Sequence, residues 1–254
     1  MWRYLRTGLL FYLLVIVAIG AWLSSERSTD WQETLWVTIF PINGDDSATS
    51  AAYIENLTDS EFIDLVDFFQ REAGYYDVAL ERPFRFELGP QIQDSIPSST
   101  TIDNPLSAIL WSLRLRLWAT LLDKGNTAPA DILVFVRYHA PETNTRLAHS
   151  LGLQKGLIGV VNAYASAHYA GRNNVVVAHE ILHTLGASGK YDAGGNPVYP
   201  QGYADPDLHP LHPQTHAELM GGRIAISQFE SKMPNSLRWV VIGEMTAEEI
   251  DWIR

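Results

Sequence analysis

The most restrictive feature of the chain is the segment VVVAHEILHTLG at residues 175–186. Its apolar residues recur at helical spacing, an Asn-Asn pair precedes it, and Gly186 is a natural helix end. His179 and His183 are four residues apart, just over one helical turn, so both project from the same face of the helix. A largely apolar helix that carries His, Glu and His needs partners for these polar groups once it is buried.

A divalent metal ion is one such partner. Two neutral imidazoles one turn apart can bind a single Zn²⁺, and Glu180 lies beside His179, where it can face the open position of the metal. Zinc lowers the pKa of water from 15.7 to about 7, and a carboxylate at this place acts as general base and later protonates the leaving amine. The spacing therefore predicts His179 and His183 as zinc ligands and Glu180 as the catalytic base. The alternative is two polar histidines on an ordinary helix with Glu180 in solvent.

HEILHTLG, followed by SGKYD and later by AELMGGR, resembles the metzincin clan of zinc endopeptidases. The family pattern is His-Glu-x-x-His-x-x-Gly-x-x-(His or Asp), with a methionine-containing turn downstream. Gly186 matches the glycine of the pattern, and Met220 is the candidate for the Met-turn. The segment is similar to HTLGATDKYD of uncharacterised bacterial membrane-anchored proteins and, more distantly, to the GLPDEYD-like segment of immune-inhibitor-type peptidases. The resemblance covers about residues 175–245 and implies a zincin-like fold and peptidase activity.

The chain departs from this pattern at the third metal ligand. The resemblance places that ligand at Gly189, which has no side chain, whereas catalytic zinc normally has three protein ligands. Asp192 is the preferred substitute, because it lies three residues further along in a loop that is flanked by glycines. Glu218, two residues before Met220, is the next candidate, and the last group comprises three histidines of a Pro-rich loop: His209, His212 and His216. A site without a third ligand is the remaining alternative.

Two further interpretations of the same loop stay open. Tyr191 can reach a metal or an oxyanion, as tyrosines do in some relatives, or it can be a packed loop aromatic. Several oxygen-bearing side chains suit Ca²⁺, although residues of this kind beside Gly and Pro more often form turns; they are Asp192, Asn196, Asp205 and Asp207.

The N-terminus carries a long apolar run. Residues 7–25 hold no charge, Arg3 and Arg6 precede them, and acidic residues follow from Glu26 onward. A helix of this length covers about 30 Å, the hydrocarbon thickness of a bilayer, and positive charge on the short N-terminal side favours a cytoplasmic N-terminus. These features predict a single-pass anchor in the inner membrane, with residues 1–30 as anchor and linker and residues 31–254 outside the cytoplasm, in the periplasm. A cleaved signal peptide is the alternative.

Composition excludes several other classes of function. The chain has 18 Lys and Arg against 29 Asp and Glu, a formal net charge of −11, which is a poor match for nucleic acid. It has no Cys, so disulfides, thiolate zinc ligands and thiol catalysis are excluded.

Hydrophobic periodicity predicts mixed strands and helices after residue 30. Four strands are expected, at residues 34–42, 84–88, 132–136 and 157–161. The last one is expected to line the upper rim of the substrate cleft and to pair with an extended substrate by strand addition. Helices are expected after capping boxes at Thr58 and Thr246 and over the segment that contains the paired histidines. A further helix opening at residues 104–105 is expected to bury Leu106, Ile109, Leu110, Leu113 and Leu117. The order predicts an α+β fold, a single metzincin-like domain behind a transmembrane helix.

Together these features predict a zinc-dependent peptidase. The expected cofactor is Zn²⁺, bound by His179, His183 and Asp192, and the expected general base is Glu180. The expected partners of the protein are a peptide or protein substrate and the membrane. The competing hypothesis is a membrane-anchored zincin-fold binding or scaffold protein that is catalytically impaired because of Gly189. Hydrolysis of a non-peptide amide is a smaller alternative.

Overall fold

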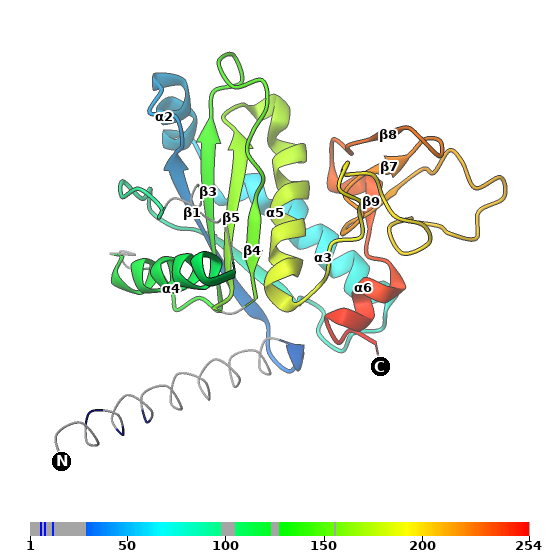
Figure 1. The fold of residues 1–254 in the computed structure, drawn as a ribbon, viewed down its shortest axis with the longest axis horizontal. Helices are drawn as coiled ribbons and strands as arrows, with labels where there is room; N and C mark the ends of the chain where they lie inside the picture. Colours follow the sequence, from blue (N-terminus) through cyan, green and yellow to red (C-terminus); the bar gives the residue numbers. More distant parts are fainter. Residues whose placement is uncertain are drawn as a thin grey trace.

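A computed structural model describes Arg6, Gly8, Tyr12 and residues 29–97, 105–122, 127–154 and 156–253. Its centre is a five-stranded sheet in the order β2-β1-β3-β5-β4 (Figure 1). The strands β1, β2, β3 and β5 are parallel to one another, and only β4 runs antiparallel, beside β5. The structure is therefore α+β with a mixed sheet. The strands are β1 (Leu35–Asn43), β2 (Phe84–Leu88), β3 (Ile132–His139), β4 (Leu151–Leu153) and β5 (Ile158–Tyr164).

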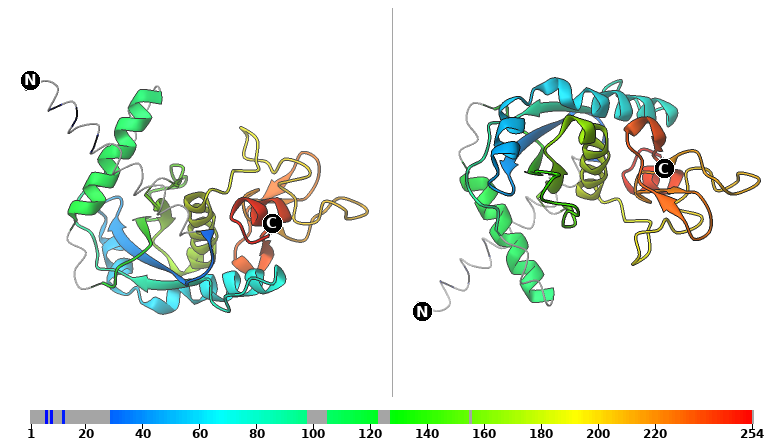
Figure 2. Two further views of the ribbon diagram at one scale, coloured as in Figure 1. Left: turned by 90° about the horizontal axis from the view of Figure 1, so that it is seen from below. Right: turned by 90° about the horizontal axis from the view of Figure 1, so that it is seen from above.

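Both faces of this sheet are covered, as the two views of Figure 2 show. On one face Ile39 and Val134 pack against α3 and α5 in the larger apolar core, while on the other Phe40 and Phe135 pack against α4 in a smaller core. The alternation follows from the strand geometry, which points successive side chains to opposite faces. The helices are α2 (Ala48–Glu55), α3 (Ile63–Tyr75), α4 (Pro105–Leu121), α5 (Ala170–Leu185) and α6 (Glu244–Glu249), with short 3₁₀ turns η1 (Asp59–Phe62), η2 (Ala167–Tyr169) and η3 (Leu237–Trp239).

Beyond α5 the chain forms a region of long loops, which we call the C-terminal lobe (residues 186–253). It lies on the side of α5 away from the sheet (Figure 1). Its regular structure is limited to η3, α6 and two-residue strands. The strands are β6 (Ala217–Glu218), β7 (Ile224–Ala225), β8 (Ser231–Lys232) and β9 (Val240–Val241).

All four predicted strands are present, with ends that differ by at most a few residues, but the substrate pairing expected for the last one is wrong. β5 lies between β3 and β4 and has no free edge. The edge strand is β4, which is too short, at three residues, to show a pattern in the sequence. The capping boxes are also absent: Thr58 makes no cap hydrogen bond at η1, and Thr246 lies inside α6 and donates its hydroxyl to Glu218.

The apolar side predicted for α4 is the wrong one. Ile109, Leu110, Leu113 and Leu117 are each about half exposed, whereas Trp111, Leu115 and Ala119 face the sheet. This helix is apolar on most sides, so its own periodicity does not decide which side is buried. The side chain of Leu106 and the predicted start at residue 104 lie outside the described residues.

The predicted membrane anchor requires a correction. No helix in the part of the chain that the structure describes is both long and apolar enough to cross a bilayer. The longest helix there, α4, has 17 residues and carries Arg114 and Arg116, and a span needs about 20 largely apolar residues. The predicted segment, residues 7–25, lies outside the described residues except for Gly8 and Tyr12. A transmembrane helix and a single-pass inner-membrane location with a periplasmic domain are thus not supported, and we withdraw both.

Candidate metal centre

The helix α5 carries the three polar residues as predicted. It ends at Gly186, which adopts a left-handed conformation with φ of 108° that glycine tolerates. Near its start the side chain of Asn173 exchanges two hydrogen bonds with the backbone of Tyr164 at the end of β5. The helix is therefore fixed against the sheet at its beginning, and most of its apolar residues, among them Ile181, are buried in the larger core.

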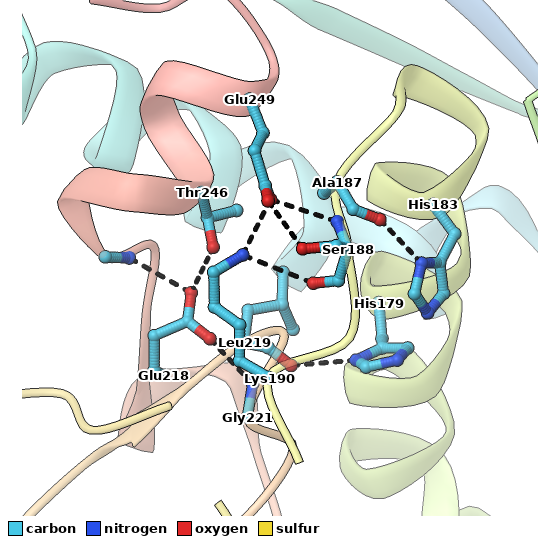
Figure 3. Close-up of polar contacts among 11 residues, drawn as sticks. His179, His183, Ala187, Ser188, Lys190, Glu218, Leu219, Gly221, Thr246 and Glu249 are labelled. Carbon is cyan, nitrogen blue, oxygen red and sulfur yellow. Dashed lines mark hydrogen bonds and ion pairs between the residues drawn. The ribbon is translucent and has the colours of Figure 1, made fainter. Parts of the chain in front are cut away.

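Each histidine of the pair is oriented by a backbone carbonyl. Nδ1 of His179 lies 2.8 Å from the carbonyl oxygen of Leu219, and Nδ1 of His183 lies 2.8 Å from that of Ala187. Because a carbonyl oxygen can only accept a hydrogen bond, both Nδ1 atoms carry the proton and both Nε2 atoms present a lone pair. Figure 3 shows the two Nε2 atoms turned toward the same side of the helix, and the ring centroids are 4.6 Å apart.

The electrostatic surroundings keep both rings neutral. The pKa of His179 is lowered to about 4, mainly by burial and to a lesser extent by the neighbouring His183. Burial also lowers the pKa of His183. At neutral pH both Nε2 lone pairs are therefore free of protons, which is the form that ligates a metal.

Glu180 is an isolated carboxylate beside this pair. It is only 5% exposed, and its Oε2 atom has no hydrogen-bond partner among the described residues. Burial raises its pKa to about 8. An unsatisfied buried carboxylate oxygen is costly, so its place beside two oriented imidazoles points to a ligand or reactant at this spot.

The edge strand β4 approaches α5 closely at this point. A Cβ atom on Gly152 would lie 2.5 Å from the carbonyl oxygen of Glu180, 2.5 Å from Cβ of His183 and 3.3 Å from Oε2 of Glu180. Only glycine leaves this space, so Gly152 sets the distance between the strand and the polar residues.

His179 and Glu180 line a cleft of about 390 Å³. One wall is the segment that leads into β4, residues 145–150, and the C-terminal lobe closes the opposite side with Tyr191, Gly222 and Met233. The first wall is attached to β5, because the side-chain amide of Asn162 donates to the carbonyl oxygens of Ala148 and His149 at 3.3 and 3.1 Å. An extended ligand in this cleft would pass both the edge of the sheet and the isolated carboxylate.

The preferred third ligand, Asp192, does not join the two histidines. It is exposed, and its Oδ1 atom accepts hydrogen bonds from the backbone N–H groups of Gly194 and Asn196 at 2.8 and 2.9 Å. These bonds lower its pKa. The carboxylate therefore closes a turn of its own loop.

Glu218 has a different function in the structure. It is fully buried and accepts hydrogen bonds from the N–H of Gly221 at 2.6 Å, the N–H of Gly243 at 3.2 Å and the hydroxyl of Thr246 at 2.7 Å (Figure 3). Neighbouring Met220 is also fully buried, and its carbonyl accepts a 2.8 Å bond from the N–H of Lys190. Both residues organise the chain beneath the histidines.

The loop histidines make contacts of their own. His212 shares a 3.1 Å hydrogen bond with the hydroxyl of Tyr203, His216 lies against Trp239, and His209 is exposed. Within the described ranges no three His, Cys, Asp or Glu side chains come together as a metal-binding group. The residues considered for Ca²⁺ form local turns instead: Asp205 accepts from the N–H of Asp207, and Asp192 from its own loop.

Sequence reasoning missed three contributors to this site: the carbonyls of Ala187 and Leu219, and Gly152. A backbone carbonyl has no sequence signature, and only the position of Leu219 beside Met220 hinted at its role. Gly152 lies in a short segment without a recognisable pattern.

Comparison with protein-family models found no match, and comparison with curated proteins found none. Among solved structures, the chain is similar to one described as "Structure of a chaperone-substrate complex", at 15% sequence identity and a TM-score of 0.37. The match covers 86% of this chain and 33% of that one, so the chain spans about a third of that length. This likeness is too weak to bear on fold or function.

Proposed function

We propose that the chain is a zinc-dependent peptidase in which His179 and His183 bind the metal and Glu180 is the general base. The observation that carries the proposal is the orientation of the two rings by the carbonyls of Leu219 and Ala187. A histidine that binds a metal through one ring nitrogen generally donates its other ring N–H to a carbonyl, carboxylate or water. The unpartnered Oε2 of Glu180 beside them supports the same conclusion.

The residues of the site suit this ion in chemical type. Two neutral imidazoles are preferred zinc ligands, and a bound Zn²⁺ supplies Lewis acidity, which polarises an amide carbonyl and acidifies water. A divalent cation beside Glu180 would lower the pKa that burial raises. The ionised carboxylate could then take a proton from the attacking water at its Oε2 atom and return it to the nitrogen of the leaving amine. The Oε2 atom has no hydrogen-bond partner among the described residues, so it is available to a water molecule in the cleft.

A peptide is the substrate class that the cleft favours. The edge of β4 that faces away from β5 pairs with no described strand, and an extended chain can add to such an edge through backbone hydrogen bonds. The segment 145–150, which Asn162 holds against β5, lines the cleft next to this edge. Backbone pairing recognises the repeating amide, which is also the group that is cleaved.

The full-length protein tests the proposal in two measurements. Zinc content by elemental analysis and cleavage of a peptide library are expected to be lost together with a chelator and restored by Zn²⁺. Glu180→Gln should retain zinc and lose about 100- to 10,000-fold in kcat/KM, while Glu55→Gln, an exposed glutamate at the end of α2, should keep full activity. A well-folded protein that binds no zinc and cleaves no peptide would contradict the proposal and favour the scaffold hypothesis.

A further inference from the structure

The position of the expected third ligand is not open space in the structure. A Cβ atom on Gly189 would lie 3.0 Å from both Cε1 and Cζ of Tyr191 and 3.2 Å from its hydroxyl oxygen. The phenol ring of Tyr191 therefore occupies the volume into which a side chain at residue 189 would extend. The glycine and the tyrosine are complementary, because any larger residue at 189 would displace this ring.

The ring of Tyr191 lies beside the histidine pair. Its centroid is 5.9 Å from that of His179, with an angle of 33° between the planes, and it lines the same cleft as His179 and Glu180. Across the described residues its hydroxyl oxygen has no hydrogen-bond partner. It thus offers an unengaged oxygen donor in the cleft that His179 lines.

The backbone around Tyr191 is held in place, so the ring is not on a free loop. The N–H of Lys190 donates to the carbonyl of Met220 at 2.8 Å, and the carbonyl of Lys190 accepts from Val198 at 2.9 Å. The ammonium group of Lys190 is buried and lies 2.6 Å from a carboxylate oxygen of Glu249 (Figure 3). The residue before Tyr191 is fixed through its backbone and its side chain, which preorganises the phenol.

We propose that Tyr191 is the third protein ligand and takes the role that Gly189 cannot fill. This inference rests on the proposed function, since it concerns the same ion. On binding, the phenol O–H bond breaks, the proton leaves to solvent, and the phenolate oxygen bonds to the metal, so two neutral nitrogens and one anionic oxygen hold it. An anionic oxygen is the same charge type as the aspartate that the family pattern allows at this position, beside histidine.

Metal binding without turnover tests the inference. The full-length protein is loaded with Cu²⁺, for which phenolate ligation gives a visible charge-transfer band, and Zn²⁺ affinity is measured by competition with a chromophoric chelator. Tyr191→Phe should abolish the band and weaken Zn²⁺ binding by at least about 100-fold. Tyr199→Phe, an exposed tyrosine of the same lobe, is the matched control and should change neither. Circular dichroism and thermal unfolding of each variant verify the fold.

A rescue variant separates ligation from simple packing. Tyr191→Ala vacates the volume beside residue 189, and the double variant Tyr191→Ala/Gly189→Asp places a carboxylate there. The single variant is expected to lose Zn²⁺ affinity and the double variant to regain at least about 10-fold of it, without the copper band.

The outcomes distinguish the inference from the function on which it rests. If the wild-type protein binds zinc and depends on Glu180, but Tyr191→Phe keeps the same affinity and shows no change in the copper spectrum, the tyrosine is not a ligand and only this inference fails. If the wild-type protein binds neither metal, the proposed function and the inference fail together.

Discussion

The sheet with its helices and the C-terminal lobe share one apolar core, to which the lobe contributes Met220, Leu237 and Ile250, but their backbones are held in different ways. In the sheet, residues such as Ile39, Phe135 and Val161 are buried among apolar side chains, and regular strands satisfy the backbone. In the lobe, buried polar side chains hold irregular backbone: Gln214 donates to the carbonyls of Asp205 and Leu211 at 2.8 Å each, and Glu218 accepts three hydrogen bonds. An apolar core tolerates substitutions that conserve side-chain volume. When a buried hydrogen bond is lost, by contrast, the polar group left without a partner destabilises the fold by its full desolvation penalty.

The candidate site lies where these two regions meet. The sheet region contributes α5 with its polar triad, and the lobe contributes the carbonyl of Leu219 and the ring of Tyr191. A substitution that disorders the lobe should therefore weaken metal binding even when the sheet stays intact, because the imidazole of His179 would no longer be oriented by the carbonyl of Leu219.

The largest effect is expected from removing the polar centre of the lobe. Glu218→Ala leaves the N–H groups of Gly221 and Gly243 and the hydroxyl of Thr246 without an acceptor in a fully buried place, so the free energy of unfolding should fall by about 3 kcal/mol. Urea denaturation measures this change. Glu248→Ala, an exposed neighbour in α6, is the control, and an equal effect of both substitutions would contradict the distinction between the two regions.

A smaller but more local effect is expected at the sheet edge. Gly152→Ala places a Cβ atom 2.5 Å from backbone and Cβ atoms of α5, which should cost about 2 kcal/mol and push β4 away from Glu180. Gly159 is its partner in the β4–β5 register, yet a Cβ there would meet its nearest neighbours at 3.6 Å. Gly159→Ala should therefore be tolerated. Thermal unfolding of the two variants compares them, and equal stabilities would refute the close approach.

The ion pair at the base of the lobe should make stability depend on pH. Burial acts to raise the pKa of Glu249, but hydrogen bonds from Lys190 and Ser188 outweigh it, and the pKa is lowered from its ordinary value of 4.5. Because the unfolded chain binds this proton more readily, the contribution is present above pH 4.5 and is lost as the pH falls through the lowered value.

Glu249→Gln should accordingly reduce stability at neutral pH by about 1 kcal/mol, a value that allows for the partial exposure of the carboxylate. The difference from wild type should shrink below pH 4.5. Denaturation curves between neutral and acidic pH measure it, and a difference that stays constant over this range would show that the charge of Glu249 is not involved.

The smallest effect is expected at Asp192, the ligand that the sequence favours. Since its carboxylate closes its own exposed turn, Asp192→Ala should leave Zn²⁺ affinity unchanged within about twofold, in contrast to Tyr191→Phe. Loss of zinc from the alanine variant would reverse the assignment of the third ligand.

Much of the sheet region was predictable because its signals are local. The strands at residues 34–42, 84–88 and 132–136 are recognisable from consecutive apolar or alternating residues, and α5 from its spacing and its terminal glycine. The buried side of α4 was not predictable, since Leu113 and Leu115 are equally apolar and only the sheet selects between them. Most of the lobe has no periodic pattern, so its arrangement depends on contacts such as that between Glu72 and the N–H of Ile242, 170 residues away.

By itself the sequence determined that two histidines and a glutamate share one helix. The four-residue spacing and the helical period involve only residues that are close together along the chain, so they can be read without knowing the fold. The tertiary structure alone decided which carbonyls orient the rings, how close the edge strand comes at Gly152, and which side chain occupies the space beside Gly189. These depend on residues that are distant in sequence, and their approach is determined by the packing of the lobe against α5.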